Sequence, residues 1–161
     1  GHQELMKHMN VYHEAVGEVV HENRGEIISI NGDSVLSYFP DTDLQKAAGN
    51  AATAALALVT AAENRLSNSR IQIGVSIGIN SDVVGIGIFG SKYRRQIGCF
   101  GQARNLCGHL MSINHLYHTN VILSEFTDAR LPAQFDRREI DILRVKGLDK
   151  PMRIFELTNT G

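Results

Sequence analysis

The first twenty-odd residues show the apolar pattern of a helix. Apolar side chains recur at three- and four-residue spacing from Leu5 to Val20, which predicts one amphipathic helix over residues 3–23. Gly25 follows this stretch and is expected to end the helix, because glycine is the commonest residue just beyond a helix carboxyl terminus. The pattern then changes to that of strands.

Two short β-rich runs follow the helix and predict a hairpin. The runs cover residues 26–30 and 34–39, and Asn31-Gly32-Asp33 joins them. Asn and Gly tolerate positive φ, so this combination favours a tight turn between antiparallel strands. An aspartate at such a tip either makes the turn or holds a metal ion, and the pattern alone leaves both open.

The middle of the chain predicts a helix and then a second hairpin. Asp43 is placed to cap an alanine-rich helix that ends near Leu66, and the small side chains would allow this helix to pack closely on a sheet. Residues 70–79 and 82–89 are rich in Ile, Val and Gly, which predicts two strands. We expect them to form a hairpin joined at Asn80-Ser81.

The last third of the chain predicts one helix and three strands. The helix covers residues 102–117, and a short buried strand at 120–125 leads into a helical turn. Residues 138–145 and 152–158 predict a final strand pair. The order of elements predicts an α+β fold, with helices packed on a largely antiparallel sheet.

Composition narrows the class of protein. The 161 residues, of which 43% are apolar, suit a single globular domain over residues 1–161. The net charge of -1 gives no basic field for nucleic acid, and no apolar run approaches the ~20 residues of a membrane span. Cys99 and Cys107 have no metal-ligand spacing, so we expect inert thiols in a reducing, cytoplasmic setting.

Four motifs occur in an order that points to one family. They are "NGDSVLSYF", the glycine-rich "IGVSIGINSDVVGIGIFGS", "GQARN" and "KGLDKP". With these motifs the chain resembles the catalytic domain of class III nucleotidyl cyclases, the adenylate and guanylate cyclases. The resemblance covers nearly the whole chain and implies the ferredoxin-like-derived fold of that family.

The resemblance also implies a reaction and an assembly. Cyclases of this class form cAMP or cGMP and pyrophosphate from the nucleoside triphosphate, with two Mg²⁺ or Mn²⁺ ions, at sites between two subunits. ATP is favoured over GTP here, in a homodimer or a cyclase-type heterodimer. Asp33 occupies the position of a metal-binding aspartate of the family, and oxygen ligands suit both ions.

Three further positions carry over from the family. Asn105 matches the asparagine that orients the ribose, Arg94 falls where many members have an arginine near the phosphates, and Lys146 matches a lysine that meets the phosphate tail. A point charge is sufficient for that contact. The alternative is that Arg94 belongs to a solvated basic loop and that Lys146 is an ordinary turn lysine.

Three positions depart from the family pattern. The two base-reading positions hold Ser29 and Gly98, which offer no charged or long polar side chain. Cys99 lies one residue beyond, and a one-residue shift along a strand turns a side chain to the opposite face, so we expect this thiol to point into the core. His109 stands in place of the transition-state arginine one turn after Asn105, and histidine replaces arginine poorly.

The first metal aspartate of the family lies on a strand upstream of the first helix, and this sequence starts at that helix. Asp33 therefore has no partner carboxylate here. Either the family's first strand is absent, or, as we expect, the chain is a fragment of a longer multidomain signalling protein, cytoplasmic or tethered to a membrane by a segment outside it. Two hypotheses follow. One is a nucleotidyl cyclase domain that is weak or inactive in this form, and the other is a degenerate cyclase homology domain that acts as a regulatory or dimerisation module.

Overall fold

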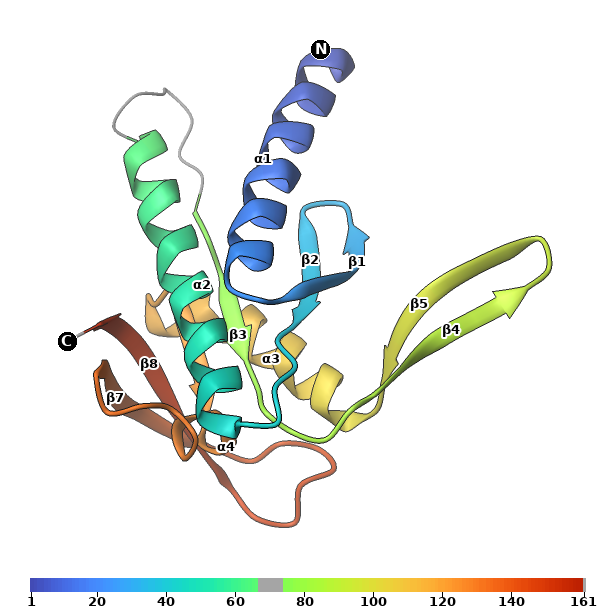
Figure 1. Ribbon diagram of the computed structural model, residues 1–161. Helices are drawn as coiled ribbons and strands as arrows, with labels where there is room; N and C mark the ends of the chain where they lie inside the picture. The colour runs from blue at the N-terminus through green and yellow to red at the C-terminus, as the bar shows by residue number, and fades with distance from the viewer. Residues whose placement is uncertain (67–73, 161) are drawn as a thin grey trace.

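The structure is a computed structural model that describes residues 1–66 and 74–160. In chain order the elements are α1 (His2–Glu22), β1 (Glu26–Asn31), β2 (Ser34–Tyr38), α2 (Leu44–Leu66), β3 (Ile77–Ile79), β4 (Gly85–Ser91), β5 (Arg94–Phe100), α3 (Gln102–Tyr117), β6 (Val121–Ser124), α4 (Glu125–Asp128), β7 (Phe135–Leu143) and β8 (Met152–Thr160). Figure 1 shows a body made of α2, α3 and the strands near the C-terminus, from which the β4–β5 hairpin projects as an arm. None of the described helices is long and apolar enough to cross a membrane.

The strands of the described residues form three separate sheets. The largest has the order β3-β6-β8-β7, with β6 parallel to β3 and antiparallel to β8, and β7 antiparallel to β8. β1 pairs with β2, and β4 pairs with β5, each as a two-stranded antiparallel sheet. The predicted α+β class with a mostly antiparallel arrangement is confirmed, and so is the final strand pair.

The predicted hairpin around Asn80-Ser81 is wrong. β3 pairs in parallel with β6, and the real hairpin is β4–β5, which turns at residues 92–93. Asn80 and Ser81 do not make a turn because their side chains bond to Ser124 and Thr127, and the chain then runs on to Gly85 before the next strand begins. Residues 70–73 of the predicted strand lie outside the described residues.

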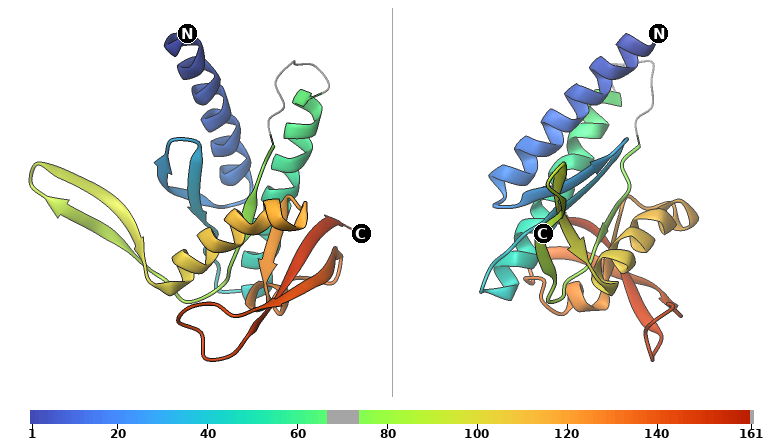
Figure 2. Two further views of the ribbon diagram at one scale, coloured as in Figure 1. Left: turned by 180° about the vertical axis from the view of Figure 1, so that it is seen from behind. Right: turned by 90° about the vertical axis from the view of Figure 1, so that its right-hand side faces the viewer.

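Helices cover both faces of the four-stranded sheet. On one face α2 packs its alanines against the sheet in a cluster made of Ala48, Ala52, Ala55, Val121, Leu123, Leu131, Phe135, Phe155 and Leu157. On the other face α3 packs in a cluster made of Leu106, Leu110, Ile113, Ile122, Met152 and Ile154. Successive residues of β6 therefore alternate between the two clusters, as the pleat of a strand requires. Figure 2 shows α2 and α3 on opposite sides of these strands.

The end of α1 differs from the prediction. The residue with left-handed backbone is Arg24, with φ of 62°, and the N–H groups of Arg24 and Gly25 donate to the carbonyl groups of His21 and Val20. These two bonds form a Schellman motif. Gly25 is needed for a different reason, because a Cβ there would lie 2.5 Å from the ring of Phe39.

One predicted turn and one predicted helix cap are confirmed. Gly32 takes a φ of 61° in the two-residue turn between β1 and β2, which leaves Asp33 at the tip. Asp43 caps α2, because its Oδ1 accepts bonds from the N–H groups of Gln45 and Lys46. The sequence signals for the turn and for the cap are local, and tertiary packing did not override them.

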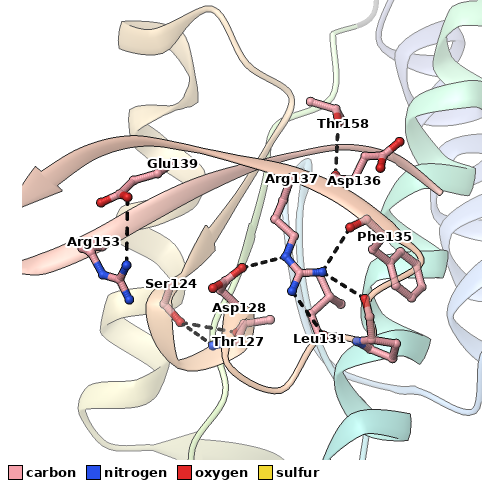
Figure 3. Close-up of polar contacts among 11 residues, drawn as sticks. Ser124, Thr127, Asp128, Leu131, Phe135, Asp136, Arg137, Glu139, Arg153 and Thr158 are labelled. Carbon is pink, nitrogen blue, oxygen red and sulfur yellow. Dashed lines mark hydrogen bonds and ion pairs between the residues drawn. The ribbon is translucent and has the colours of Figure 1, made fainter. Parts of the chain in front are cut away.

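The loop between α4 and β7 is held by one arginine. The Arg137 guanidinium donates to Asp128 Oδ1 at 2.8 Å and to the carbonyl oxygens of Pro132, Phe135 and Leu131 at 2.9, 3.1 and 3.4 Å (Figure 3). All these partners accept from one planar group, so the loop takes a single path from α4 back to the sheet.

Candidate functional site

The hairpin tip that carries Asp33 lies against α1. The ring of His13 lies with Nε2 2.9 Å from the carbonyl oxygen of Gly32, which ties the helix to the tip. Tyr12 lines the same cavity as Asp33, and its pKa is raised by burial and, to a lesser extent, by the charge of Asp33. Asp33 itself is exposed to solvent. The tip therefore presents a free carboxylate from a position that α1 fixes.

A two-metal centre needs more oxygen ligands than this tip provides. Within residues 1–66 and 74–160 no group of three or more His, Cys, Asp or Glu side chains comes together. Asp33 offers one carboxylate, whereas Mg²⁺ demands six ligands in near-ideal octahedral geometry. The described residues do not by themselves fit the metal site that the resemblance implies.

A cavity of about 1630 Å³ opens between α1, the β1–β2 hairpin, α2, β3 and α3. Ser29, Asp33 and Asn105 all line it, so three of the predicted positions face one space. Among the described strands β3 pairs only with β6, and all three residues of β3 line the cavity. The cavity thus separates the four-stranded sheet from the β1–β2 hairpin.

The first turn of α3 carries Asn105 and is fixed to β3. Gly101 precedes it with a φ of 116° and provides no side-chain cap. Asn80, directly after β3, donates from Nδ2 to the carbonyl oxygen of Ala103 at 3.1 Å, and its Oδ1 accepts a bond of 2.7 Å from Ser124 Oγ. Asn105 is exposed. The bond from Asn80 therefore fixes the start of the helix, while the exposed amide of Asn105 is accessible to a ligand.

Replacing Ser124 with alanine is expected to lower the free energy of unfolding by about 2 kcal/mol. Ser124 is fully buried, accepts the Thr127 N–H as the cap of α4 (Figure 3) and donates to Asn80. The substitution removes the cap and leaves Asn80 Oδ1 without this donor. Urea unfolding measures the change, and Ser112→Ala, which removes only a hydroxyl bonded within the exposed face of α3, is the control.

Lys146 lies beside the same helix start. It occupies an exposed turn in which the Leu148 N–H donates to the Val145 carbonyl oxygen at 3.1 Å. Gln102, the first residue of α3, donates from Nε2 to the carbonyl oxygen of Lys146 at 3.0 Å. The structure therefore places the turn of Lys146 against the helix that carries Asn105.

Arg94 is not brought to this place within one chain. It is the first residue of β5, opposite Ser91, and so lies near the far end of the β4–β5 arm. Figures 1 and 2 show that this end points away from the body. The side chain is exposed, as in the alternative interpretation of a solvated basic loop.

Gly98 is covered by two aromatic rings. A Cβ at this position would lie 2.5 Å from the Phe89 ring and 2.7 Å from the Phe100 ring. The two rings are packed edge to face, with their centroids 5.1 Å apart. Any base-reading side chain here would have to displace them. Cys99, the next residue, is buried at 7% exposure, as expected, and it lines the cavity.

Both thiols are unpaired in the described residues. Cys107 Sγ donates to the carbonyl oxygen of Gly78 at 3.0 Å, and burial raises the pKa of this thiol. A raised pKa keeps the neutral form, which is a poor nucleophile. The geometry agrees with the expected inert role of Cys99 and Cys107.

The remaining two positions are accessible. Ser29 is half buried on β1, directly after a bulge at Ile28, and reaches the cavity with a short hydroxyl. His109 is exposed on α3, one turn beyond Asn105 and on the same face. Neither residue offers the charge that the family has at these places.

The sequence profile described as the adenylate and guanylate cyclase catalytic domain matches residues 2–159. The chain belongs to this cyclase family. A curated relative, the terminal-differentiation specific adenylate cyclase of Dictyostelium discoideum, is 26% identical over 130 residues, which is 78% of this chain. The cyclase-family chain spans only 6% of that relative's length.

Solved structures of cyclases share the fold of this cyclase-family domain. The adenylyl cyclase CyaB from P. aeruginosa matches with a TM-score of 0.86 and 20% identity, over 99% of this chain and 84% of that one. The guanylate cyclase domain of RhGC from Catenaria anguillulae, in complex with GTP, matches with a TM-score of 0.83 and 18% identity, over 100% and 87%. At these identities the likeness establishes the fold.

Sequence reasoning missed two residues that shape the cyclase-family site. Asn80 and Gln102 hold the first turn of α3 to β3 and to the Lys146 turn. A signal for Asn80 was present, because an amide directly after an Ile-rich, half-buried strand needs hydrogen-bond partners. Gln102 gave no signal, since its partner is a backbone carbonyl far along the chain.

Proposed function

We propose that this domain is a class III nucleotidyl cyclase module that binds ATP between two subunits and forms cAMP and pyrophosphate at a low rate. One observation carries the proposal: the first turn of α3 presents an exposed Asn105 and holds the turn of Lys146 through Gln102. The preference for ATP over GTP rests on the curated relative, which is an adenylate cyclase.

The proposed roles follow from the chemistry of these side chains. The Asn105 amide both donates and accepts hydrogen bonds, which suits the ribose hydroxyl and ring oxygens. The Lys146 ammonium offers a compact positive charge to the phosphate tail. Divalent ions, which cyclases of this family generally use, would supply charge to the triphosphate when bound. Asp33 would contribute one carboxylate, and the other oxygen ligands would have to come from outside the described residues.

The cavity beside β3 has room for one more strand. β3 has a neighbour on one side only within the described sheets, and the β1–β2 hairpin lies across the cavity. We propose that an extended segment from outside residues 1–161 pairs there, as unpaired strand edges favour. In the cyclases that this chain resembles, the corresponding strand carries the other metal-binding carboxylate, which would face Asp33.

The β4–β5 arm is the surface that we propose for the second copy of the chain. Large apolar side chains stand exposed along it, with Ile88 at 74% and Tyr93 at 86%. Phe89, Ile97 and Phe100 are exposed as well. An apolar patch of this kind on a soluble domain marks an interface. A homodimer built through the arms would move Arg94 from the far end of one arm towards the other subunit.

Replacing Lys146 with alanine is expected to weaken ATP binding about tenfold, the effect of losing one charged hydrogen bond. Lys150→Ala is the matched control, since Lys150 is an exposed lysine nearby with no assigned contact. Calorimetry with ATP and with GTP in Mn²⁺ measures affinity, and product analysis detects cAMP or cGMP. If no triphosphate binds and no cyclic nucleotide forms with the protein at its natural length, the proposed function fails for the homodimer.

The structure also favours a second candidate function, a degenerate cyclase homology domain that serves as a regulatory or dimerisation module. Gly98 is closed off by Phe89 and Phe100, and His109 lacks the fork of an arginine. In that case sedimentation would show a dimer while triphosphate binding stayed absent. Formation of cGMP in place of cAMP would instead identify a guanylate cyclase.

A further inference from the structure

We propose that Gln102 is a positioning residue that holds Lys146 beside Asn105 at the nucleotide site. Its consequence for nucleotide binding rests on the proposed function. The contact itself rests on geometry, because Gln102 Nε2 lies 3.0 Å from the Lys146 carbonyl oxygen across a separation of forty-four positions in sequence.

The amide of Gln102 lies directly against Gly147, in the turn that it holds. Gly147 has a φ of +90°, and a Cβ there would lie 2.2 Å from Gln102 Nε2 and 2.8 Å from its Cδ. A Cβ here would push the Gln102 amide out of this position, and only glycine adopts this backbone easily. The turn 145–148 and the side chain of Gln102 therefore fit as a pair.

The start of the helix that carries Gln102 is fixed by hydrogen bonds. Asn80 bonds to the carbonyl oxygen of Ala103, the next residue, and Asn80 is itself held by the buried Ser124. The first turn of α3 is thus tied to β3 on one side and to the Lys146 turn on the other. A fixed helix gives Gln102 a fixed position from which to hold the turn.

Gln102 and Asn105 are three residues apart on α3, so their side chains share a face of the helix. The Lys146 carbonyl therefore bonds to the face that presents Asn105. Lys146 is exposed and long, and its ammonium group has many positions available unless the backbone is fixed. Gln102 fixes that backbone and so limits where the charge can go.

Gln102→Ala is the test, with Gln134→Ala as the matched control, an exposed glutamine in the α4–β7 loop. The first readout is hydrogen exchange of the Leu148 amide, which donates within the turn. The second is calorimetry with 3′-deoxy-ATP and Mn²⁺, which binds without cyclising. We expect Gln102→Ala to speed Leu148 exchange and to raise the Kd by about threefold to tenfold, the effect of one lost hydrogen bond.

A double-mutant cycle separates positioning from direct contact. In a Lys146→Ala background, Gln102→Ala should give no further change in Kd.

Unchanged Leu148 exchange in Gln102→Ala would overturn the proposal, as would an equal Kd effect in the presence and absence of Lys146. If exchange rises while Lys146→Ala binds 3′-deoxy-ATP as the parent does, the positioning contact stands and the proposed role of Lys146 fails.

Discussion

Gly78→Ala is expected to lower the free energy of unfolding by about 3 kcal/mol or more, at the upper end of overpacking costs. A Cβ at Gly78 would lie 2.4 Å from both the Cys107 carbonyl oxygen and the Met111 backbone nitrogen, and 2.9 Å from Leu110 Cβ. The first two are main-chain atoms of α3, so no side-chain rotation can relieve the clash. The helix itself has to move away from β3.

The movement would also break polar contacts between β3 and α3. Cys107 donates to the Gly78 carbonyl oxygen, and the fully buried Asn114 donates to that of Ile77. Gly87→Ala is the control, because a Cβ there meets nothing within 4 Å. Urea unfolding should show a large loss for the first variant and a change within about 0.5 kcal/mol for the second. Equal stability of the two variants would refute the close approach of β3 and α3.

His109→Arg is expected to raise turnover about a hundredfold in a dimer with measurable cyclase activity. His109 lies one turn after Asn105 on the same exposed face, where an arginine could meet charge that develops on the phosphate. Loss of one preorganised donor to such charge costs about 10²- to 10³-fold in rate, so restoring it should recover much of that factor. The fork of arginine supplies two donors where histidine supplies one.

His21→Arg is the charge-matched control, because it adds the same group at an exposed position of α1 that does not line the cavity. The rate of cyclic nucleotide formation at saturating ATP and Mn²⁺ is the measurement. A gain for His109→Arg alone supports a preserved catalytic geometry. Equal rates for both variants and the parent would mean that α3 no longer presents this position to a phosphate.

Local signals predicted the elements that depend on neighbouring residues. The Asn31-Gly32-Asp33 turn, the Asp43 cap and the extent of α3 follow from chemistry within a few positions, and the structure has all three. The pairing of β3 did not follow, because Ile- and Gly-rich strands show no preference between the next strand and one that comes later. What decided it was the network of Asn80 and Ser81 with α3 and α4.

The candidate site, too, was predicted from the sequence only in part. Asp33 and Asn105 were found by their motifs, and the structure places both on one cavity. Their proposed roles stay predictions, as do those of Ser29, Arg94 and Lys146. The closure of Gly98 by Phe89 and Phe100 could not be predicted, because it depends on which face of the arm each ring takes.

The parallel pairing of β3 with β6 also sets the order in which the fold can form. The β1–β2, β4–β5 and β7–β8 pairs join neighbouring segments and can form early, because little chain entropy is lost in closing them. Ile77 meets Val121 only after the whole arm and α3 have been spanned. The arm and α3 together set the length of the loop that must close before the two apolar clusters can come together, and the entropy cost of that closure grows only slowly with loop length.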